Sequence, residues 1–211
     1  MNRIGIFGTS GMAKEAGDIA WEIGYSPIYV ARDGIELEAI ASTHEVILEN
    51  DVNRYRDIGF VIGIGDNRIR QEIARRHLGA LQFISLIHPS ASFGRGQREH
   101  IESKRGVIVC AGVRFTNSIQ IGDHCIFNLN CTISHDVMID ECVYVAPGAH
   151  ITGNVHIGAR SWVGTGAAIH QGANDRKLQI GENTIVGSGA VVTQDCDSNA
   201  TYAGVPARRI K

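Results

Sequence analysis

Large apolar residues return at every sixth position through much of the second half of the chain. They are Val109, Phe115, Ile121, Phe127, Ile133, Ile139, Val145, Ile151, Ile157, Val163 and Ile169. Small or β-branched residues stand four positions after most of them. A period of six fits neither the 3.6 residues of a helical turn nor the alternation of a simple strand. The pattern predicts a repeat architecture in which each unit is stabilised by stacking on its neighbours.

Short strands, three to a coil, satisfy this period by forming a stacked parallel prism. The large residue then points into the shaft, and the polar residues between rungs face outward. Corners between strands favour Gly, Asn and Asp, which tolerate unusual backbone angles. We expect corners at positions such as Gly122, Gly148 and Gly158.

The first part of the chain follows a different pattern, in which short apolar runs alternate with helical spacing. Strands are predicted over 4–7, 27–31, 60–64 and 81–87, and helices over 13–23 and 68–78. This alternation indicates a parallel sheet of about four strands. We therefore predict an α/β domain with a small Rossmann-like parallel sheet at residues 1–88, followed by an all-β parallel β-helix at residues 89–211. The polar segment 95–105 is expected to be a solvated loop.

A glycine-rich turn follows the first predicted strand. Gly8-Thr9-Ser10-Gly11-Met12 precedes a helix, an arrangement that directs backbone N–H groups at a phosphate. It lacks the full dinucleotide fingerprint, because Ser10 and Ala13 stand where the second and third glycines would be. Tight packing is the alternative explanation of this turn. Two further segments, Arg32-Asp33 and Gly65-Asp66-Asn67, follow strands at the edge where an open α/β sheet meets a ligand.

His135 is the best candidate for chemistry within the repeat. It lies two residues after the inward-facing Ile133, so it belongs to a corner and faces outward. One coil is eighteen residues long, which places Gly153 directly above it and leaves room for a ligand. Asp136 follows in sequence and is placed to orient the imidazole. Other histidines of the repeat, such as His124, are expected to be surface residues.

The repeat breaks once, since eleven residues separate Ile169 from Ile180. The extra residues, within 171–179, should leave the prism at the edge that carries His135. Insertions of this kind often carry function. We expect this one to cover a site.

Composition excludes several classes of function. The chain has 211 residues and a formal net charge of -2, so it has no basic footprint for nucleic acid. No apolar run approaches the length of a membrane span. The five cysteines form no CxxC pair, and we interpret them as small buried residues in a reducing, cytoplasmic compartment.

The six-residue pattern resembles that of the hexapeptide-repeat acyltransferases, whose fold is a left-handed parallel β-helix. With the glycine-turn α/β domain, the Ser-His-Asp corner and the tail Gly204-Val205-Pro206-Ala207, the chain is similar to sugar acyltransferases that join a small nucleotide-binding domain to such a helix. The likeness is greatest to acetyl-CoA-dependent N-acetyltransferases of UDP-4-amino-dideoxy sugars, as in bacillosamine biosynthesis. It covers nearly the whole chain.

The resemblance implies roles for particular residues. The catalytic histidine and its acid fall on His135 and Asp136. The nucleotide-sugar contacts fall on Ser10, Gly11, Met12, Arg32, Asp33 and Gly65. The acetyl-CoA contacts fall on Tyr144, Thr165 and Ser188, with Gly153 beside the thioester. Relatives often carry a second histidine at the position of Tyr144. The resemblance also implies a homotrimer and a reaction without a metal.

The implied reaction is direct transfer, in which His135 takes a proton from the sugar amine as the amine attacks the thioester. Histidine suits this role because it exchanges its proton near neutral pH. Two alternatives stay open. The first is an O-acetyltransferase of a sialic-acid-like sugar, which would use the same base on a hydroxyl group. The second is a non-catalytic or metal-binding solenoid, although no two histidines have the five-residue spacing of the carbonic-anhydrase-like solenoids.

Overall fold

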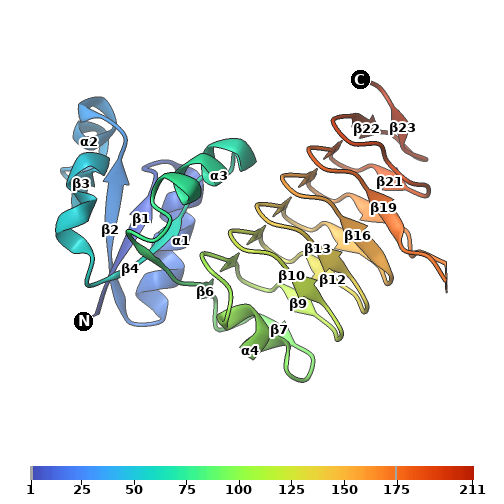
Figure 1. Cartoon of the computed structure of the whole chain (residues 1–211), viewed down its shortest axis with the longest axis horizontal. Helices are drawn as coiled ribbons and strands as arrows, with labels where there is room; N and C mark the ends of the chain where they lie inside the picture. Colours follow the sequence, from blue (N-terminus) through green and yellow to red (C-terminus); the bar gives the residue numbers. More distant parts are fainter. Residues whose placement is uncertain (1, 174) are drawn as a thin grey trace.

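The computed structural model describes residues 2–173 and 175–211 and contains an α/β domain beside a β-solenoid (Figure 1). The α/β domain has a five-stranded parallel sheet in the order β3-β2-β1-β4-β5. Its strands are β1 (Asn2–Phe7), β2 (Tyr25–Ala31), β3 (Val46–Leu48), β4 (Gly59–Ile62) and β5 (Gln82–Phe83). Its helices are α1 (Gly11–Glu22), α2 (Gly34–Ile40) and α3 (Asn67–Arg76), with a 3-10 helix at Glu49–Tyr55.

The solenoid has three faces, each a ladder of very short parallel strands. We call them the docking face, the second face and the third face, in the order in which the chain visits them. The docking face consists of β6 (Leu86–Ile87), β8 (Ile108–Val109), β11 (Ile126–Phe127), β14 (Tyr144–Val145), β17 (Trp162–Val163), β20 (Ile185–Val186), β22 (Thr201–Ala203) and β23 (Arg208–Arg209), the last pairing antiparallel. The second face consists of β7 (Ser92–Phe93), β9 (Arg114–Phe115), β12 (Thr132–Ile133), β15 (His150–Ile151), β18 (Ala168–Ile169) and β21 (Val191–Val192). The third face consists of β10 (Gln120–Ile121), β13 (Met138–Ile139), β16 (Val155–Ile157) and β19 (Leu178–Ile180).

The apolar rungs fill the shaft as the period of six predicts. Ile133 pairs in register with Phe115 below and Ile151 above, so each rung stacks on its counterpart one coil away. These residues and the small residues four positions later form one continuous core. The five cysteines are free and buried, which confirms their interpretation as small core residues.

The corners turn at one position of the repeat, three residues after the rung, and of the three glycines expected at corners only Gly148, with a φ of 65°, occupies it. At most other corners this position also lies in the left-handed region but carries another residue, as at His124, Cys142 and Arg160. Gly122 and Gly158 are not in that region. Glycine is required at both positions because a side chain would clash with the backbone of the next coil. A Cβ on Gly122 would lie 2.5 Å from the backbone nitrogen of Glu141, and a Cβ on Gly158 would lie 2.6 Å from the backbone nitrogen of Glu182.

Three other expectations were wrong. The predicted strand 81–87 is two strands, β5 in the α/β sheet and β6 in the docking face, so the chain changes sheet between Phe83 and Leu86. The α/β sheet has a fifth strand, β3, whose three residues are too few to show periodicity. The segment 95–105 contains helix α4 (Gln97–Glu102), because Ile101 is fully buried and anchors it to the first coil. The division into domains at residue 88 stays a prediction.

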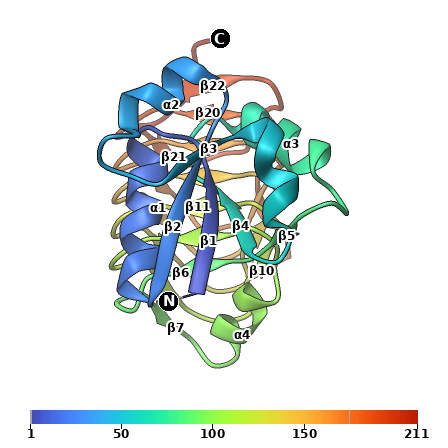
Figure 2. The same cartoon turned by 90° about the vertical axis from the view of Figure 1, so that its left-hand side faces the viewer.

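The α/β domain packs on the N-terminal coils of the docking face. Ala13, Ala16 and Ala20 of α1 share one apolar cluster with Ile108 and Ile126. Figure 2 shows the sheet and α1 in front of the solenoid coils. Helix α3 reaches the edge between the third face and the docking face, where Asn67 and Arg70 contact it. No helix within residues 2–173 and 175–211 is long and apolar enough to cross a bilayer.

Candidate active site

His135 stands at the corner between β12 and β13, the edge where the second face meets the third face. Its Nδ1 lies 2.8 Å from Oδ2 of Asp136, so the carboxylate holds the ring in one orientation. The two side chains are 57% and 56% exposed, which leaves the other ring nitrogen accessible to a ligand. Asp136 has a φ of 59°, and this left-handed corner turns its side chain back to the imidazole.

Gly153 lies directly against the imidazole, one coil above it. A Cβ at this position would lie 2.5 Å from Cε1 and 2.6 Å from Nε2 of His135. Any side chain at residue 153 would therefore displace the ring. The structure thus brings together three of the predicted residues, His135, Asp136 and Gly153.

The insertion leaves the prism at this same edge, as its position in the repeat predicts. A cleft of about 430 Å³ contains His135 and Gly153 and is bounded by Gly172, Ala173 and Lys177 of the insertion. The Lys177 ammonium donates to the carbonyl oxygen of Asp136, and to Oδ1 of Asn154 at 3.1 Å. Residue 174, within the predicted insertion, lies outside the described residues.

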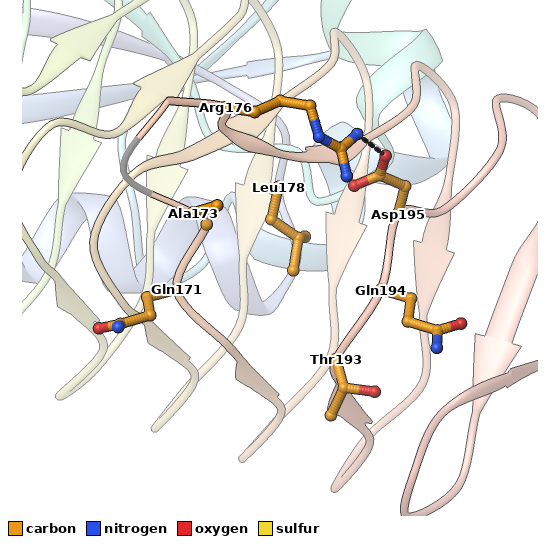
Figure 3. A pocket seen from close by; sticks show the side chains of 8 residues that line it. Gln171, Ala173, Arg176, Leu178, Thr193, Gln194 and Asp195 are labelled. Carbon is orange, nitrogen blue, oxygen red and sulfur yellow. Dashed lines mark hydrogen bonds and ion pairs between the residues drawn. The ribbon is translucent and has the colours of Figure 1, made fainter.

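A second cleft of about 460 Å³ continues along this edge on the other side of the insertion. Figure 3 shows Arg176 of the insertion reaching Asp195, with a distance of 2.5 Å between Nη1 and Oδ2. Gln171, Leu178 and Thr193 also line this cleft. This edge therefore carries an elongated surface that starts at His135 and runs toward the C-terminal coils.

A separate pocket of about 390 Å³ lies at the carboxyl ends of the α/β sheet strands. Ser10 and Arg32, both predicted nucleotide-sugar contacts, line it together with Glu36 and Arg76. The Arg32 guanidinium pairs with Asp33 at 3.1 Å and with Glu36 at 3.3 Å. A mixture of cationic and carboxylate groups suits a ligand with phosphates and hydrogen-bond donors.

The other four predicted nucleotide-sugar contacts, Gly11, Met12, Asp33 and Gly65, do not line this pocket. Asp33 caps helix α2, since its Oδ1 accepts from the N–H of Glu36, and this bond and Arg32 lower the pKa of Asp33. Gly11 begins α1 and faces open space. Met12 packs toward the docking face near Asn128. A methyl group on Gly65 would lie 3.9 Å from the rings of Tyr144 and Trp162.

The predicted acetyl-CoA contacts do not all lie near His135 of the same chain. Tyr144 lies on the docking face, where its ring stacks on Trp162 with centroids 4.1 Å apart and its hydroxyl accepts from Asn128 at 2.6 Å. Burial raises the pKa of Tyr144. Thr165 and Ser188 are exposed and lie in successive coils at the corner between the docking face and the second face. Within one chain, His135 therefore faces away from these three residues.

Sequence reasoning missed several residues that the fold brings to these sites. Lys177 and Asn154 flank the His135 corner, and Glu36 and Arg76 line the pocket of the α/β domain. The position of Lys177 within the insertion was one available signal. The period of the repeat was another, because it places Asn154 one coil above Asp136. Glu36 and Arg76 come from distant segments, so only the fold shows that they face a pocket.

The fold and the two sites define a class: a hexapeptide-repeat transferase with an attached α/β domain. Comparisons with known proteins agree. The model of the PglD N-terminal domain family matches residues 3–77. The chain is 30% identical to GDP-perosamine N-acetyltransferase of Escherichia coli O157:H7, over all of this chain and 97% of that protein.

Solved structures resemble the whole chain. The acetyltransferase domain of PglB from Neisseria gonorrhoeae FA1090 has a TM-score of 0.84 and 25% identity, with full coverage of both chains. PerB from Caulobacter crescentus, in complex with CoA and GDP-perosamine, has a TM-score of 0.83 and 26% identity over all of this chain and 98% of that one. WeeI from Acinetobacter baumannii AYE has a TM-score of 0.84 and 26% identity, again with full coverage.

The chain therefore belongs to the family of hexapeptide-repeat, acetyl-CoA-dependent sugar N-acetyltransferases with a PglD-type N-terminal domain. This confirms the predicted enzyme class, its acetyl-CoA co-substrate and the combination of a Rossmann-like sheet with a β-helix. Within residues 2–173 and 175–211, no three His, Cys, Asp or Glu side chains converge as metal ligands would.

Proposed function

We propose that this enzyme transfers an acetyl group from acetyl-CoA to the amine of a nucleotide-linked 4-amino-dideoxy sugar. The observation that carries the proposal is the His135–Asp136 pair beside Gly153, open to a cleft, in a chain that has a separate pocket at the carboxyl ends of the α/β sheet strands. A UDP-linked sugar of the bacillosamine type is one candidate substrate. GDP-perosamine is the other, supported by the names of a curated relative and a solved structure.

In the proposed reaction, the neutral imidazole of His135 removes a proton from the sugar amine as its nitrogen attacks the thioester carbonyl carbon. Asp136 orients the ring and stabilises the imidazolium that forms. The carbon–sulfur bond then breaks, and the CoA thiolate leaves and takes up the proton held by the His135 imidazolium, which becomes neutral again. The backbone N–H of Gly153 donates to no acceptor among the described residues, so it is available to stabilise the developing oxyanion.

We further propose that the working site forms between subunits of a homotrimer. His135 occupies the only one of the three solenoid edges that does not border the docking face. The nucleotide pocket is attached to the docking face, and Tyr144, Thr165 and Ser188 lie on that face or at its other edge. A neighbouring subunit that presents its own docking face to His135 would bring all of these residues together. Light scattering, which measures the molar mass of the protein particle in solution, tests the proposed trimer. A monomer at assay concentration would contradict it.

We infer that the enzyme acts in the cytoplasm. The support is that all five cysteines are free and buried, and unpaired cysteines are typical of a reducing compartment.

A substrate screen tests the proposed reaction. Purified protein is incubated with acetyl-CoA and a panel of UDP- and GDP-linked amino sugars, and products are followed by mass spectrometry. We expect a gain of one acetyl group on a 4-amino sugar only. Matched sugars with a hydroxyl in place of the amine serve as the control. Acetylation of those, and not of the amines, would favour the O-acetyltransferase of a sialic-acid-like sugar instead.

A further inference from the structure

Arg70 of helix α3 is a fully buried cation at the junction of the two domains. A guanidinium carries five N–H donors, and the structure gives an acceptor for each. Nε donates to the carbonyl of His124 at 2.7 Å, and Nη1 to the carbonyls of Ile64 and Gly65 at 2.8 and 3.1 Å. Nη2 donates to Oδ1 of Asn67 at 2.7 Å and to the carbonyl of Cys142 at 2.9 Å.

The solenoid acceptors form a column. His124, Cys142 and Arg160 are spaced eighteen residues apart and lie in successive coils, each in the left-handed region with φ of 57°, 56° and 58°. Arg70 binds the first two carbonyls, and Nδ2 of Asn67 binds the third at 2.9 Å. Asn67 and Arg70, near the N-terminus of α3, therefore hydrogen-bond to three consecutive coils at one edge of the solenoid.

A role in packing alone does not account for an arginine here. None of its five acceptors is a carboxylate, and burial lowers the pKa of Arg70. Buried charges are costly, and apolar side chains of similar volume often stabilise such positions equally well or better. What an apolar side chain lacks is the planar fork, which fixes several carbonyls at defined distances.

The fork also fixes the loop after β4. Ile64 lines the nucleotide pocket, and Gly65 lies against the Tyr144–Trp162 stack of the docking face. Through the carbonyls of these two residues, Arg70 links the wall of the nucleotide pocket directly to the solenoid.

We propose that Arg70 is a positioning residue that sets where the bound sugar nucleotide lies relative to the docking face of its own subunit, and therefore relative to the His135 of the neighbouring subunit that this face meets. This inference rests on the proposed function, since it assumes that the α/β domain holds the nucleotide and that a solenoid edge holds the acetyl donor. Misplacing the amine by about 1 Å is enough to lower turnover about 100-fold.

The test compares Arg70→Met, Arg70→Lys and the matched control Arg75→Met, an exposed arginine of the same helix. Kinetics with the sugar nucleotide, isothermal titration with the nucleoside diphosphate alone and with CoA, and thermal unfolding are measured on each full-length protein. For Arg70→Met we expect kcat to fall about 10- to 100-fold. The affinities for the nucleoside diphosphate and for CoA should stay within about threefold of wild type, because the Arg70 side chain is buried behind the wall of the pocket and does not line it. Arg70→Lys, with three donors, should recover part of kcat.

Equal turnover of Arg70→Met and wild type would overturn the proposal, as would a matched loss of nucleoside diphosphate affinity, which would assign Arg70 to the pocket instead. If Arg70→Met does not fold, Asn67→Ser takes its place. It removes both bonds to the third coil, at Arg160 and Ser161, and should show the same separation of kcat from affinity. Wild-type protein that acetylates no sugar nucleotide would contradict the proposed function. If wild type is active and Arg70→Met and Asn67→Ser both fold and match its turnover, only the positioning role of Arg70 is contradicted.

Discussion

At the scale of single residues, the site depends on how one imidazole is held. Asp136 forms a hydrogen bond with Nδ1 of His135 and so fixes the ring from one side. The imidazole lies so close to residue 153 that only a glycine fits there. Both restraints come from the corner geometry of the repeat, so the proposed base needs no special loop to hold it. A rigid repeat is a suitable support for a site that must keep its geometry.

His135→Ala should lower kcat by about 10²- to 10⁴-fold, the usual contribution of a positioned general base. Thermal unfolding should be nearly unchanged, because the side chain is 57% exposed. Steady-state kinetics with the substrate from the screen measure this. Turnover close to wild type would remove His135 from the role of base.

Gly153→Ala should lower kcat by about 10- to 100-fold, because the new methyl group would lie 2.5 Å from the imidazole and displace it. The matched control is Gly34→Ala, where a Cβ has no atom within 4 Å. The two variants are compared in kcat and unfolding temperature. A Gly153→Ala enzyme as active as Gly34→Ala would show that the ring position does not matter.

At the scale of elements, the solenoid is built from short strands, each paired with its counterpart one coil away. A strand of two or three residues is too short to be stable alone, and its apolar rung gains stability by packing on the rungs of the neighbouring coils. The same logic explains helix α4: the polar composition of 95–105 favours a loop, but the single buried residue Ile101 secures a short helix.

Ile139→Ala removes one rung and should lower the free energy of unfolding by about 2–5 kcal/mol, because the side chain is only 3% exposed. The control Ile35→Ala changes a side chain that is 83% exposed and should cost less than about 0.5 kcal/mol. Denaturant unfolding at one fixed protein concentration compares them. Equal losses in the two variants would contradict the stacked-rung description.

At the scale of the whole molecule, the junction between the domains contains a second unusual group. His124, expected at the surface, is only 7% exposed, because the α/β domain covers this corner and its ring meets Phe83 edge-on. Its Nδ1 is buried and has no hydrogen-bond partner among residues 2–173 and 175–211. Burial lowers the pKa of His124 to about 4.

This shift makes stability depend on pH. Between about pH 6.5 and pH 4, His124 binds a proton in the unfolded chain but not in the folded one, so acidification favours unfolding. We expect the contribution of His124 to the free energy of unfolding to fall by up to about 1.4 kcal/mol per pH unit across this window.

His124→Asn keeps a residue that tolerates the left-handed corner and removes the titrating group. Unfolding free energies measured from pH 7 to pH 4 should fall less steeply for this variant than for wild type. His170→Asn, at an exposed position, is the control and should keep the wild-type slope. Parallel curves for wild type and His124→Asn would contradict the assignment.

The sequence by itself determined the elements that depend on local pattern. The period of six in the apolar residues dictates the coil, its shaft and the column that places Gly153 over His135, because side chains eighteen residues apart must stack once three strands make a turn. The extra residues after Ile169 had to leave the prism at the same edge for the same reason.

Only the tertiary structure decided how the two domains meet. The docking of α3 on the corners at His124 and Cys142 joins residues more than fifty positions apart, and no periodicity records it. Burial at this junction lowers the pKa of His124, and the contact gives Arg70 two of its five acceptors, the carbonyl oxygens of His124 and Cys142. It also separated the pocket of the α/β domain from His135 within one chain, because a flat face and the opposite corner of a prism cannot adjoin.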